Sequence, residues 1–419
     1  MKKTILGFSI LALFAYCTIV FLFTASPMRF HGGDGGWFCL PCDLELVVAE
    51  NELLCSGIDP YDVYVGKKNV PGYIGSDATA GASHSNVGDM RVMAHPPWVY
   101  TAFMPLTLLS HRSATFAYFC VMMSCMALLV LCGVWIAQRN GCARQDAIIA
   151  ACLSVLAISF PVFQDFLSMN WALVTLSAAV LMAVCLNKGH DILAGVCWAF
   201  VMVKPQIGLA FAIPLIIKCR VKTCAAAVVT CLVASIPPSL MSGTSFWKMI
   251  FVIPGTYVHE FWGCGTMPRF VVNLIPSGAA VMAGLVIGAV VCALMTYKMK
   301  SEKDWFFFLM PAAACSMSWT YARCYSHVMA WFFFICLAAS IVKGSRARSQ
   351  WIIAVFALFF TTRAWNFIHM LPTAIPSVFP VFLPSEEWHY NIDTINSLVD
   401  LVLVFSFCYL HVKEHEQNG

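Results

Sequence analysis

The first polar stretch of the chain holds the strongest candidate for acid-base chemistry. Asp43 opens the segment DLELVVAENELLCSG, in which apolar residues recur at helical spacing and Gly57 provides a stop. The pattern predicts an amphipathic helix lying on a membrane, with its acidic residues on the opposite face and Asp43 at its N-terminus. A carboxylate at this position could act as a general base. It could instead only cap the helix, by accepting hydrogen bonds from the first turn.

A second carboxylate, Asp34, lies in the glycine-rich run His31-Gly32-Gly33-Asp34-Gly35-Gly36. Glycine-rich surroundings fit a catalytic loop and fit a simple turn equally well. Asp34 is therefore the alternative base. The pair Asp43 and Glu45 could also hold a divalent cation, but no further ligand lies nearby in the sequence. We predict no resident metal and no cofactor.

Three basic residues, Lys204, Arg323 and His327, fall at the ends of apolar segments. A fixed positive charge at such a position could stabilise a phosphate that gains negative charge during a reaction. The same residues could simply anchor helices by extending to the polar interface of a membrane. The sequence leaves both interpretations open.

Composition indicates what kind of protein must position these side chains. Of the 419 residues, 60% are hydrophobic and 11% are charged, and the mean hydropathy is +0.78. These values exclude a soluble globular protein, and a net charge of +4 does not indicate binding to nucleic acid. We expect an all-α integral membrane protein, a single polytopic domain over residues 1–419 with about twelve transmembrane helices. The expected spans are 5–25, 113–137, 146–162, 170–187, 191–203, 206–217, 223–241, 272–297, 304–319, 325–342, 350–363 and 392–411.

The distribution of charge predicts how these helices are oriented. The apolar stretch 98–110 is short and carries Pro105, so we interpret it as a re-entrant or interfacial segment within an outer loop, 26–112. Fifteen of the 25 Lys and Arg residues then fall on one side, which the positive-inside rule assigns to the cytoplasm. Both termini are then cytoplasmic. The first span is a retained anchor, because its apolar run is too long for a cleaved signal peptide.

Two details of this scheme stay open. The segments 191–203 and 206–217 are short and flank Lys204, so they could form one broken helix pair with a bent outer tip. The cysteines Cys39, Cys42, Cys55 and Cys264 fall in outer loops, where they could form a disulfide or remain free.

Several motifs follow one another in a recognisable order. Asp43 begins a short helix that leads to Gly57-Ile58-Asp59-Pro60-Tyr61, soon after one N-terminal span. Then come His95-Pro96-Pro97-Trp98 with Pro105, the turn Lys204-Pro205-Gln206, and Ser318-Trp319 followed by Tyr325-Ser326-His327. From residue 1 to about 345, this order resembles the multispanning glycosyltransferases of family 87, in the GT-C superfamily. One departure is Met169-Asn170-Trp171, where members often have Gly-Gln-x-Asn, so that only Asn170 could keep that role.

The resemblance implies a GT-C-like fold and an inverting transfer at the outer face. The donor would be a monosaccharide on a polyprenyl phosphate, mannose or a pentose, and the acceptor a lipid- or envelope-linked glycan. Asp43 would be the base, with Asp34 as the alternative. Residues expected to contact the substrates are Lys204, His327, Arg323, Asn170, Tyr61 and His95.

Two other functions compete with this interpretation. A twelve-helix secondary transporter would fit the number of helices, but such proteins hold ionisable residues near the middle of the membrane. Here charged residues are nearly absent from the middle of the expected spans, with Asp400 as the exception, and two similar halves are not evident. A noncatalytic component of envelope glycan assembly is the remaining alternative.

Overall fold

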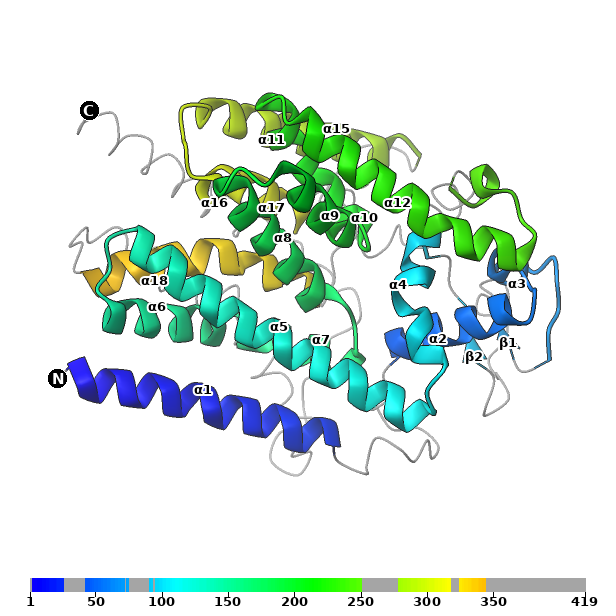
Figure 1. Cartoon of the computed structure of the whole chain (residues 1–419), viewed down its shortest axis with the longest axis horizontal. Coiled ribbons are helices and arrows are strands. Elements are labelled where there is room, and N and C mark those ends of the chain that lie inside the picture. The colour runs from blue at the N-terminus through cyan, green and yellow to red at the C-terminus, as the bar shows by residue number, and fades with distance from the viewer. Residues whose placement is uncertain are drawn as a thin grey trace, which may run out of the picture.

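The computed structural model describes residues 2–25, 42–71, 73–74, 90–92, 95–250, 278–317 and 324–343. Almost all of these residues are helical (Figure 1). The exception in regular structure is one parallel bridge between two strands of two residues, in which Tyr73 pairs with Met90. The elements are α1 Lys2–Ala25, α2 Cys42–Cys55, α3 Pro60–Tyr64, β1 Tyr73–Ile74, β2 Met90–Arg91, α4 Pro97–Thr107, α5 His111–Arg139, α6 Arg144–Ala157, α7 Ser159–Ser168, α8 Ala172–Asn187, α9 Asp191–Val201, α10 Pro205–Gly208, η3 Leu209–Phe211, α11 Ala212–Ile217, α12 Val221–Ser242, α15 Gly278–Lys298, α16 Trp305–Phe308, α17 Met310–Ser316, η5 Cys324–Ala330 and α18 Trp331–Lys343.

The long helix α5 organises the bundle, because α6, α8 and α18 all pack against it. From this centre the contacts continue outward, with α1 on α6, α9 on α8 and α12 on α9. Helix α4 crosses the direction of α5 and contacts α2 and α12 at the end opposite the N-terminus (Figure 1). The elements α2, α3 and α4 therefore form a small cap at one end of the bundle.

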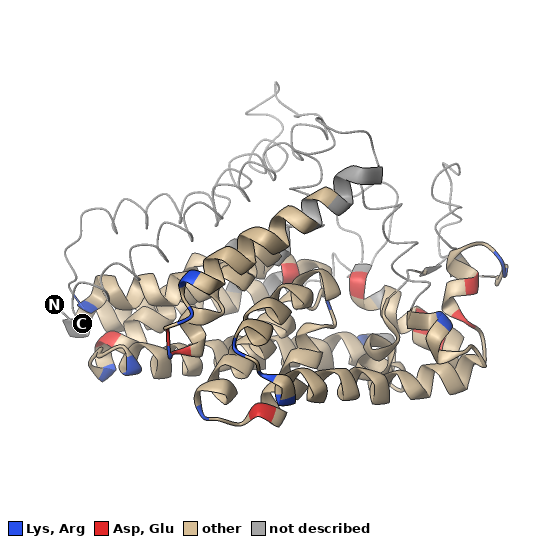
Figure 2. Cartoon of the chain, turned by 90° about the horizontal axis from the view of Figure 1, so that it is seen from above, with Lys and Arg blue, Asp and Glu red and all other residues tan. Residues whose placement is uncertain are grey.

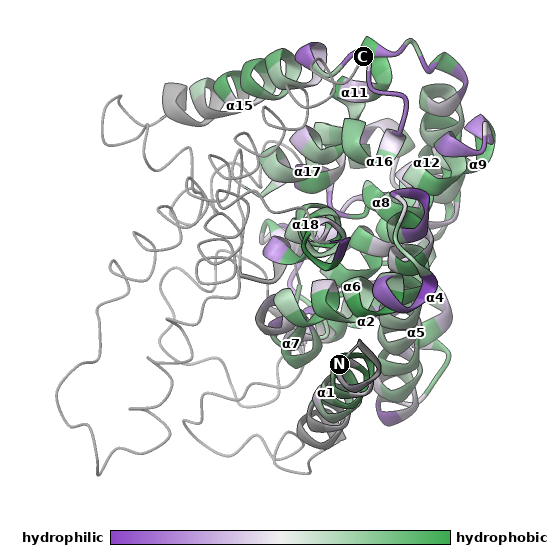
Figure 3. Ribbon diagram, turned by 90° about the vertical axis from the view of Figure 1, so that its left-hand side faces the viewer, coloured by the Kyte–Doolittle hydropathy of each residue, from purple (hydrophilic) through white to green (hydrophobic). Residues whose placement is uncertain are grey.

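Hydropathy follows this arrangement. The helix bodies are mostly hydrophobic, and the hydrophilic positions lie mainly at turns and helix ends (Figure 3). Large apolar side chains such as Leu131, Leu240 and Val290 are exposed on α5, α12 and α15. Exposed apolar helix faces fit contact with lipid rather than water.

Two described helices, α5 and α12, are long and apolar enough to cross a membrane, and the bent pair α6 and α7 would make a third span. The expected spans that lie within the described residues coincide with helices, but several are interrupted. Span 146–162 bends by 60° between α6 and α7, where Pro161 lies in the first turn of α7. Spans 304–319 and 325–342 likewise divide into shorter pieces. The expected number of about twelve is therefore not reached in the described residues, and spans 350–363 and 392–411, including Asp400, lie outside them.

The structure agrees with the interpretation of two regions as something other than full spans, the stretch 98–110 and the segments on either side of Lys204. Most of the stretch 98–110 lies in the 11-residue helix α4, Pro97–Thr107, and at about 1.5 Å per residue this helix is too short to cross a bilayer. Segments 191–203 and 206–217 form α9 and the pieces α10, η3 and α11, separated by a turn at Lys204. The broken pair therefore describes this region better than two full spans.

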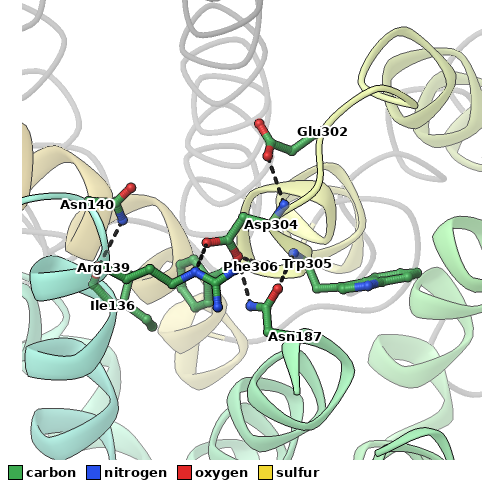
Figure 4. A network of polar contacts seen from close by, with 8 residues as sticks. All are labelled: Ile136, Arg139, Asn140, Asn187, Glu302, Asp304, Trp305 and Phe306. Atoms are coloured by element: carbon green, nitrogen blue, oxygen red, sulfur yellow. Dashed lines mark hydrogen bonds and ion pairs between the residues drawn. The ribbon is translucent and has the colours of Figure 1, made fainter. Parts of the chain in front are cut away.

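The loops that the charge pattern assigns to one side do meet at one end of the bundle. Arg139 Nε lies 3.2 Å from Asp304 Oδ2, and Asn187 Nδ2 donates to the same carboxylate at 2.8 Å (Figure 4). Lys343 Nζ donates to the carbonyl oxygen of Asn140 at 3.2 Å. Elsewhere charged residues lie mainly at turns and helix ends (Figure 2). That these loops share an end is confirmed; which side of the membrane they face stays a prediction.

The predicted helix after Asp43 has the expected bounds, ending before Gly57, which adopts a φ of +71°. The prediction that it is amphipathic, with its acidic residues facing away from the core, is wrong. Glu50 and Asn51 are both fully buried. The reason is that α2 packs against α4, α12, α7 and β2 on different sides, so the helix has little free face.

The close contact between α9 and α12 at Gly195 leads to a testable prediction. A methyl group on Gly195 of α9 would lie 2.6 Å from Ala226 Cβ of α12 and even closer to the Thr223 carbonyl oxygen. Gly195→Ala must therefore push the two helices apart, which we expect to lower the free energy of unfolding by about 1–3 kcal/mol. Thermal unfolding in detergent measures this loss. Gly7→Ala on α1 is the control, because its methyl group meets nothing within 4 Å. Equal stability of the two variants would contradict the close packing.

Candidate functional site

The structure brings together two residues that the sequence analysis proposes for different roles, Asp43 and Asn170. Asp43 is the second residue of α2 and is half-buried. Its Oδ2 accepts a hydrogen bond from Nδ2 of Asn170, 127 positions away. Asn170 itself is only 3% exposed. An ionised carboxylate can only accept hydrogen bonds, so the amide nitrogen of Asn170 is the group that faces it.

The turn between α7 and α8 fixes where Asn170 lies. Helix α7 ends at Met169, which adopts the left-handed conformation with a φ of 48°. The backbone N–H of Asn170 then donates to the backbone carbonyl oxygen of Asp165 at 3.0 Å. Tyr118 Oη donates to the backbone carbonyl oxygen of Asn170, also at 3.0 Å. Because bonds from two helices hold its backbone, the Asn170 side chain is presented to Asp43 from a rigid turn.

A fully buried carboxylate, Asp165, lies beside this turn. Its two oxygens accept from the backbone amides of Ala172 at 3.2 Å and Leu173 at 2.8 Å, at the N-terminus of α8. Amide donors and the helix dipole at that end favour a negative charge. The carboxylate of Asp165 also lies within electrostatic range of the Lys204 ammonium, which attracts it, and of Asp43, which repels it.

The sequence analysis missed Asp165, although a signal was present. This acidic residue, five positions before Asn170, lies in the short segment between the expected spans 146–162 and 170–187. A single acidic residue ahead of a helix does not by itself indicate a functional site, because acidic residues are common near the start of helices.

Lys204 occupies the turn between α9 and α10 and is only 3% exposed. Its carbonyl oxygen accepts from the amides of Ile207 at 2.9 Å and Gly208 at 2.8 Å, so that the turn is closed locally. Gly208 packs against Met202, where a methyl group would lie 2.7 Å from the sulfur. The side chain is therefore held inside the protein, which argues against the interpretation of Lys204 as a residue extending to the membrane interface.

Tyr61 and His95 also lie close to this group. Tyr61 Oη donates to the His95 carbonyl oxygen, and His95 Nδ1 lies 2.6 Å from Glu50 Oε2. The His95 ring meets the Trp171 ring edge-on, with centroids 5.0 Å apart. Both residues are buried, and they reach the site through protein contacts. Their expected substrate contacts stay a prediction.

Of the remaining predicted residues, one is described. His327 belongs to η5, is 1% exposed, and lies on an element that packs against α7 and α8. Asp34 and Arg323 lie outside the described residues, as do the side chains of Glu45 and Cys42.

The cysteines of the expected outer loops are described only in part. Cys55 has a free and exposed thiol, while Cys39 and Cys264 lie outside the described residues. Within the ranges that the structure describes, no group of three His, Cys, Asp or Glu residues could hold a metal ion.

The arrangement combines three chemical properties. A half-buried carboxylate is oriented by a fixed amide and can accept a proton. A buried ammonium supplies a positive charge in surroundings of low dielectric, where it acts more strongly than in water. Aromatic rings line the same region, with Phe103 centroids 5.1 Å from Trp171 and 5.6 Å from Tyr118. A base, an anion-stabilising cation and apolar surfaces suit group transfer from an anionic leaving group.

Comparison with known proteins gives one finding. A family model described as glycosyltransferase family 87 matches residues 94–319, more than half of the 419 residues. The match includes His95, Tyr118, Asp165, Asn170 and Lys204, whereas Asp43 precedes it and His327 follows it. No curated protein matches the chain.

Proposed function

This chain belongs to glycosyltransferase family 87, and from that premise we propose that it transfers a monosaccharide from a polyprenyl-phosphate donor to a lipid- or envelope-linked glycan. Family membership makes it a membrane glycosyltransferase. The donor, the inverting course and the residue roles are our proposal. The observation that supports them is the convergence of Asp43, Asn170, Asp165 and Lys204 at one end of the bundle.

In the proposed reaction, an acceptor hydroxyl attacks the anomeric carbon of the donor sugar. Asp43 takes the hydroxyl proton, the new glycosidic bond forms, and the bond from the anomeric carbon to the phosphate oxygen breaks. The leaving polyprenyl phosphate carries away the electron pair. Lys204 stabilises the negative charge of this leaving group, and His327 assists as a hydrogen-bond donor. Attack opposite to the leaving group inverts the anomeric centre.

The site lies at the end of the bundle opposite the clustered basic loops, so we propose that it faces outward with both termini in the cytoplasm. A reporter fused after Lys413 should then report the cytoplasm, and a tag inserted near Thr79 should be reached from outside. Both signals on the same side would contradict this topology.

A direct assay tests the proposed activity. Membranes containing the protein are incubated with polyprenyl phosphates that carry radiolabelled mannose or a radiolabelled pentose, and transfer of label to glycolipid or envelope glycan is measured. We expect transfer with one of these donors and none with a nucleotide sugar. Transfer from a nucleotide sugar alone would contradict the proposed donor class. Family membership favours glycosyl transfer over secondary transport. Uptake of a solute into vesicles, with no transfer of labelled sugar, would instead support a secondary transporter.

A further inference from the structure

The pair Glu50 and His95 is a second polar contact of α2, about two helical turns along the helix from Asp43. His95 Nδ1 lies 2.6 Å from Glu50 Oε2, and the side chains are 8% and 0% exposed respectively. Burying such a pair is unfavourable unless both partners are well bonded. Because apolar residues often replace such a pair without loss of stability, its role can lie in fixing one arrangement of the elements that carry it.

Glu50 lies seven residues, or about two helical turns, after Asp43, so both side chains emerge from the same face of α2. Asp43 meets Asn170, while Glu50 meets His95, whose ring contacts Trp171, the next residue after Asn170. Both ends of this face are thus attached to the same turn between α7 and α8. Rotation or sliding of α2 relative to that turn would break one contact or the other.

Two further contacts fix His95 itself. Its carbonyl oxygen accepts from Tyr61 Oη, and the residues that follow it begin α4, which packs on α2. Trp171 is also held by Phe103 of α4. The backbone of His95 is therefore held by Tyr61 of α3, and its ring lies against Trp171, which α4 also contacts.

We infer that Glu50 and His95 are positioning residues, which fix the orientation of α2 and thereby aim the Asp43 carboxylate at the acceptor hydroxyl. This inference rests on the proposed role of Asp43. Catalysis by a base requires the carboxylate within hydrogen-bond reach of the proton, and an error of about 1 Å can reduce the rate about 100-fold. In this role Glu50 and His95 act through Asp43, and the role does not require the expected contact of His95 with a substrate.

Glu50→Gln tests the inference, because glutamine keeps the size of the side chain and can still accept from His95, but removes the charge that makes the contact short and strong. We expect a fall in kcat of about 10- to 100-fold, with the KM for polyprenyl-phosphate mannose unchanged. A role in stability alone would lower the amount of folded protein and leave kcat per folded molecule unchanged.

Glu52→Gln is the matched control on the same helix. Glu52 Oε2 accepts from Tyr73 Oη at 3.2 Å, away from the turn that carries Asn170. Partial burial and the Glu52 carboxylate raise the pKa of Tyr73, so its hydroxyl remains a donor. We expect Glu52→Gln to turn over like the wild type. An equal fall in kcat for both variants would overturn the specific role of Glu50.

A double-variant cycle separates this inference from the proposed function. If Glu50 acts through Asp43, then adding Glu50→Gln to Asp43→Asn causes no further loss of the residual rate. A further loss of tenfold or more would overturn the positioning role. Full activity of Asp43→Asn alone would overturn the proposed base and the positioning role together. If Glu50→Gln unfolds at a much lower temperature than Glu52→Gln, the cycle is repeated with Trp171→Leu, which removes the ring contact and leaves the buried pair in place.

Discussion

Asp43→Asn should fold, insert and bind the donor normally while transferring sugar about 10²- to 10⁴-fold more slowly than the wild type. Asparagine keeps the size of the side chain and can still accept the hydrogen bond from Asn170 Nδ2 through its own amide oxygen. The substitution therefore removes the ability to take a proton while preserving the local structure. Initial rates with the labelled donor, normalised to folded protein, measure the effect.

Three comparisons decide what the result means. Asp62→Asn is a control at the same end of the molecule, because Asp62 Oδ1 pairs with Lys248 at 3.6 Å and the pair is partly exposed. It should change the rate little, since exposed pairs contribute about 0–1 kcal/mol.

Asp34→Asn tests the alternative base. An active Asp43→Asn beside an inactive Asp34→Asn would move the assignment to Asp34. If EDTA abolishes transfer and divalent ions restore it, Asp43 and Glu45 become metal ligands instead.

Lys204→Ala has the second largest expected effect. Removing a group that stabilises a developing negative charge typically costs about 10²- to 10³-fold in kcat. We therefore expect a fall of that size, together with a higher KM for the donor. Lys204→Arg should rescue only in part, because the position is 3% exposed and the planar guanidinium needs more room than an ammonium. Lys248→Ala, at a side chain 47% exposed, is the control and should stay near the wild type.

The structural consequence of Lys204→Ala needs its own measurement. The substitution leaves Asp165 buried without the attraction of a nearby cation, and breaking a buried charge pair can cost about 3–5 kcal/mol. Combining Lys204→Met with Asp165→Asn removes both charges and should recover part of the lost stability without recovering transfer, because asparagine can still accept from one of the two backbone amides that Asp165 binds. Recovery of activity along with stability would show that Lys204 acts through folding alone.

Local features of the sequence determined much of the fold. The helix from Asp43 to Gly57, the long helix α5 and the turn at Lys204 all follow from apolar spacing, glycine and proline, which act within one or two helical turns. The shared end of the loops at Arg139, Asp304 and Lys343 follows from charge, because the direction of each helix determines which loops lie together.

The family motifs also nominated Asp43, Asn170 and Lys204 by their order along the chain. The sequence could not show that Asp43 contacts Asn170, because the two residues are 127 positions apart and meet only once α2 is packed against the turn after α7. Nor did it reveal Asp165, which is fully buried against the N-terminus of α8.

What the sequence by itself determined is where helices form, which loops share an end and which polar residues are available for chemistry. The tertiary structure alone decided that Glu50 is buried against His95 rather than exposed on an amphipathic face, and that Lys204 lies inside the protein rather than at its surface. The physical reason is that helical periodicity is a property of neighbouring residues, whereas burial depends on which helices pack together. Packing in turn depends on long-range contacts such as Gly195 against α12, which no local pattern encodes.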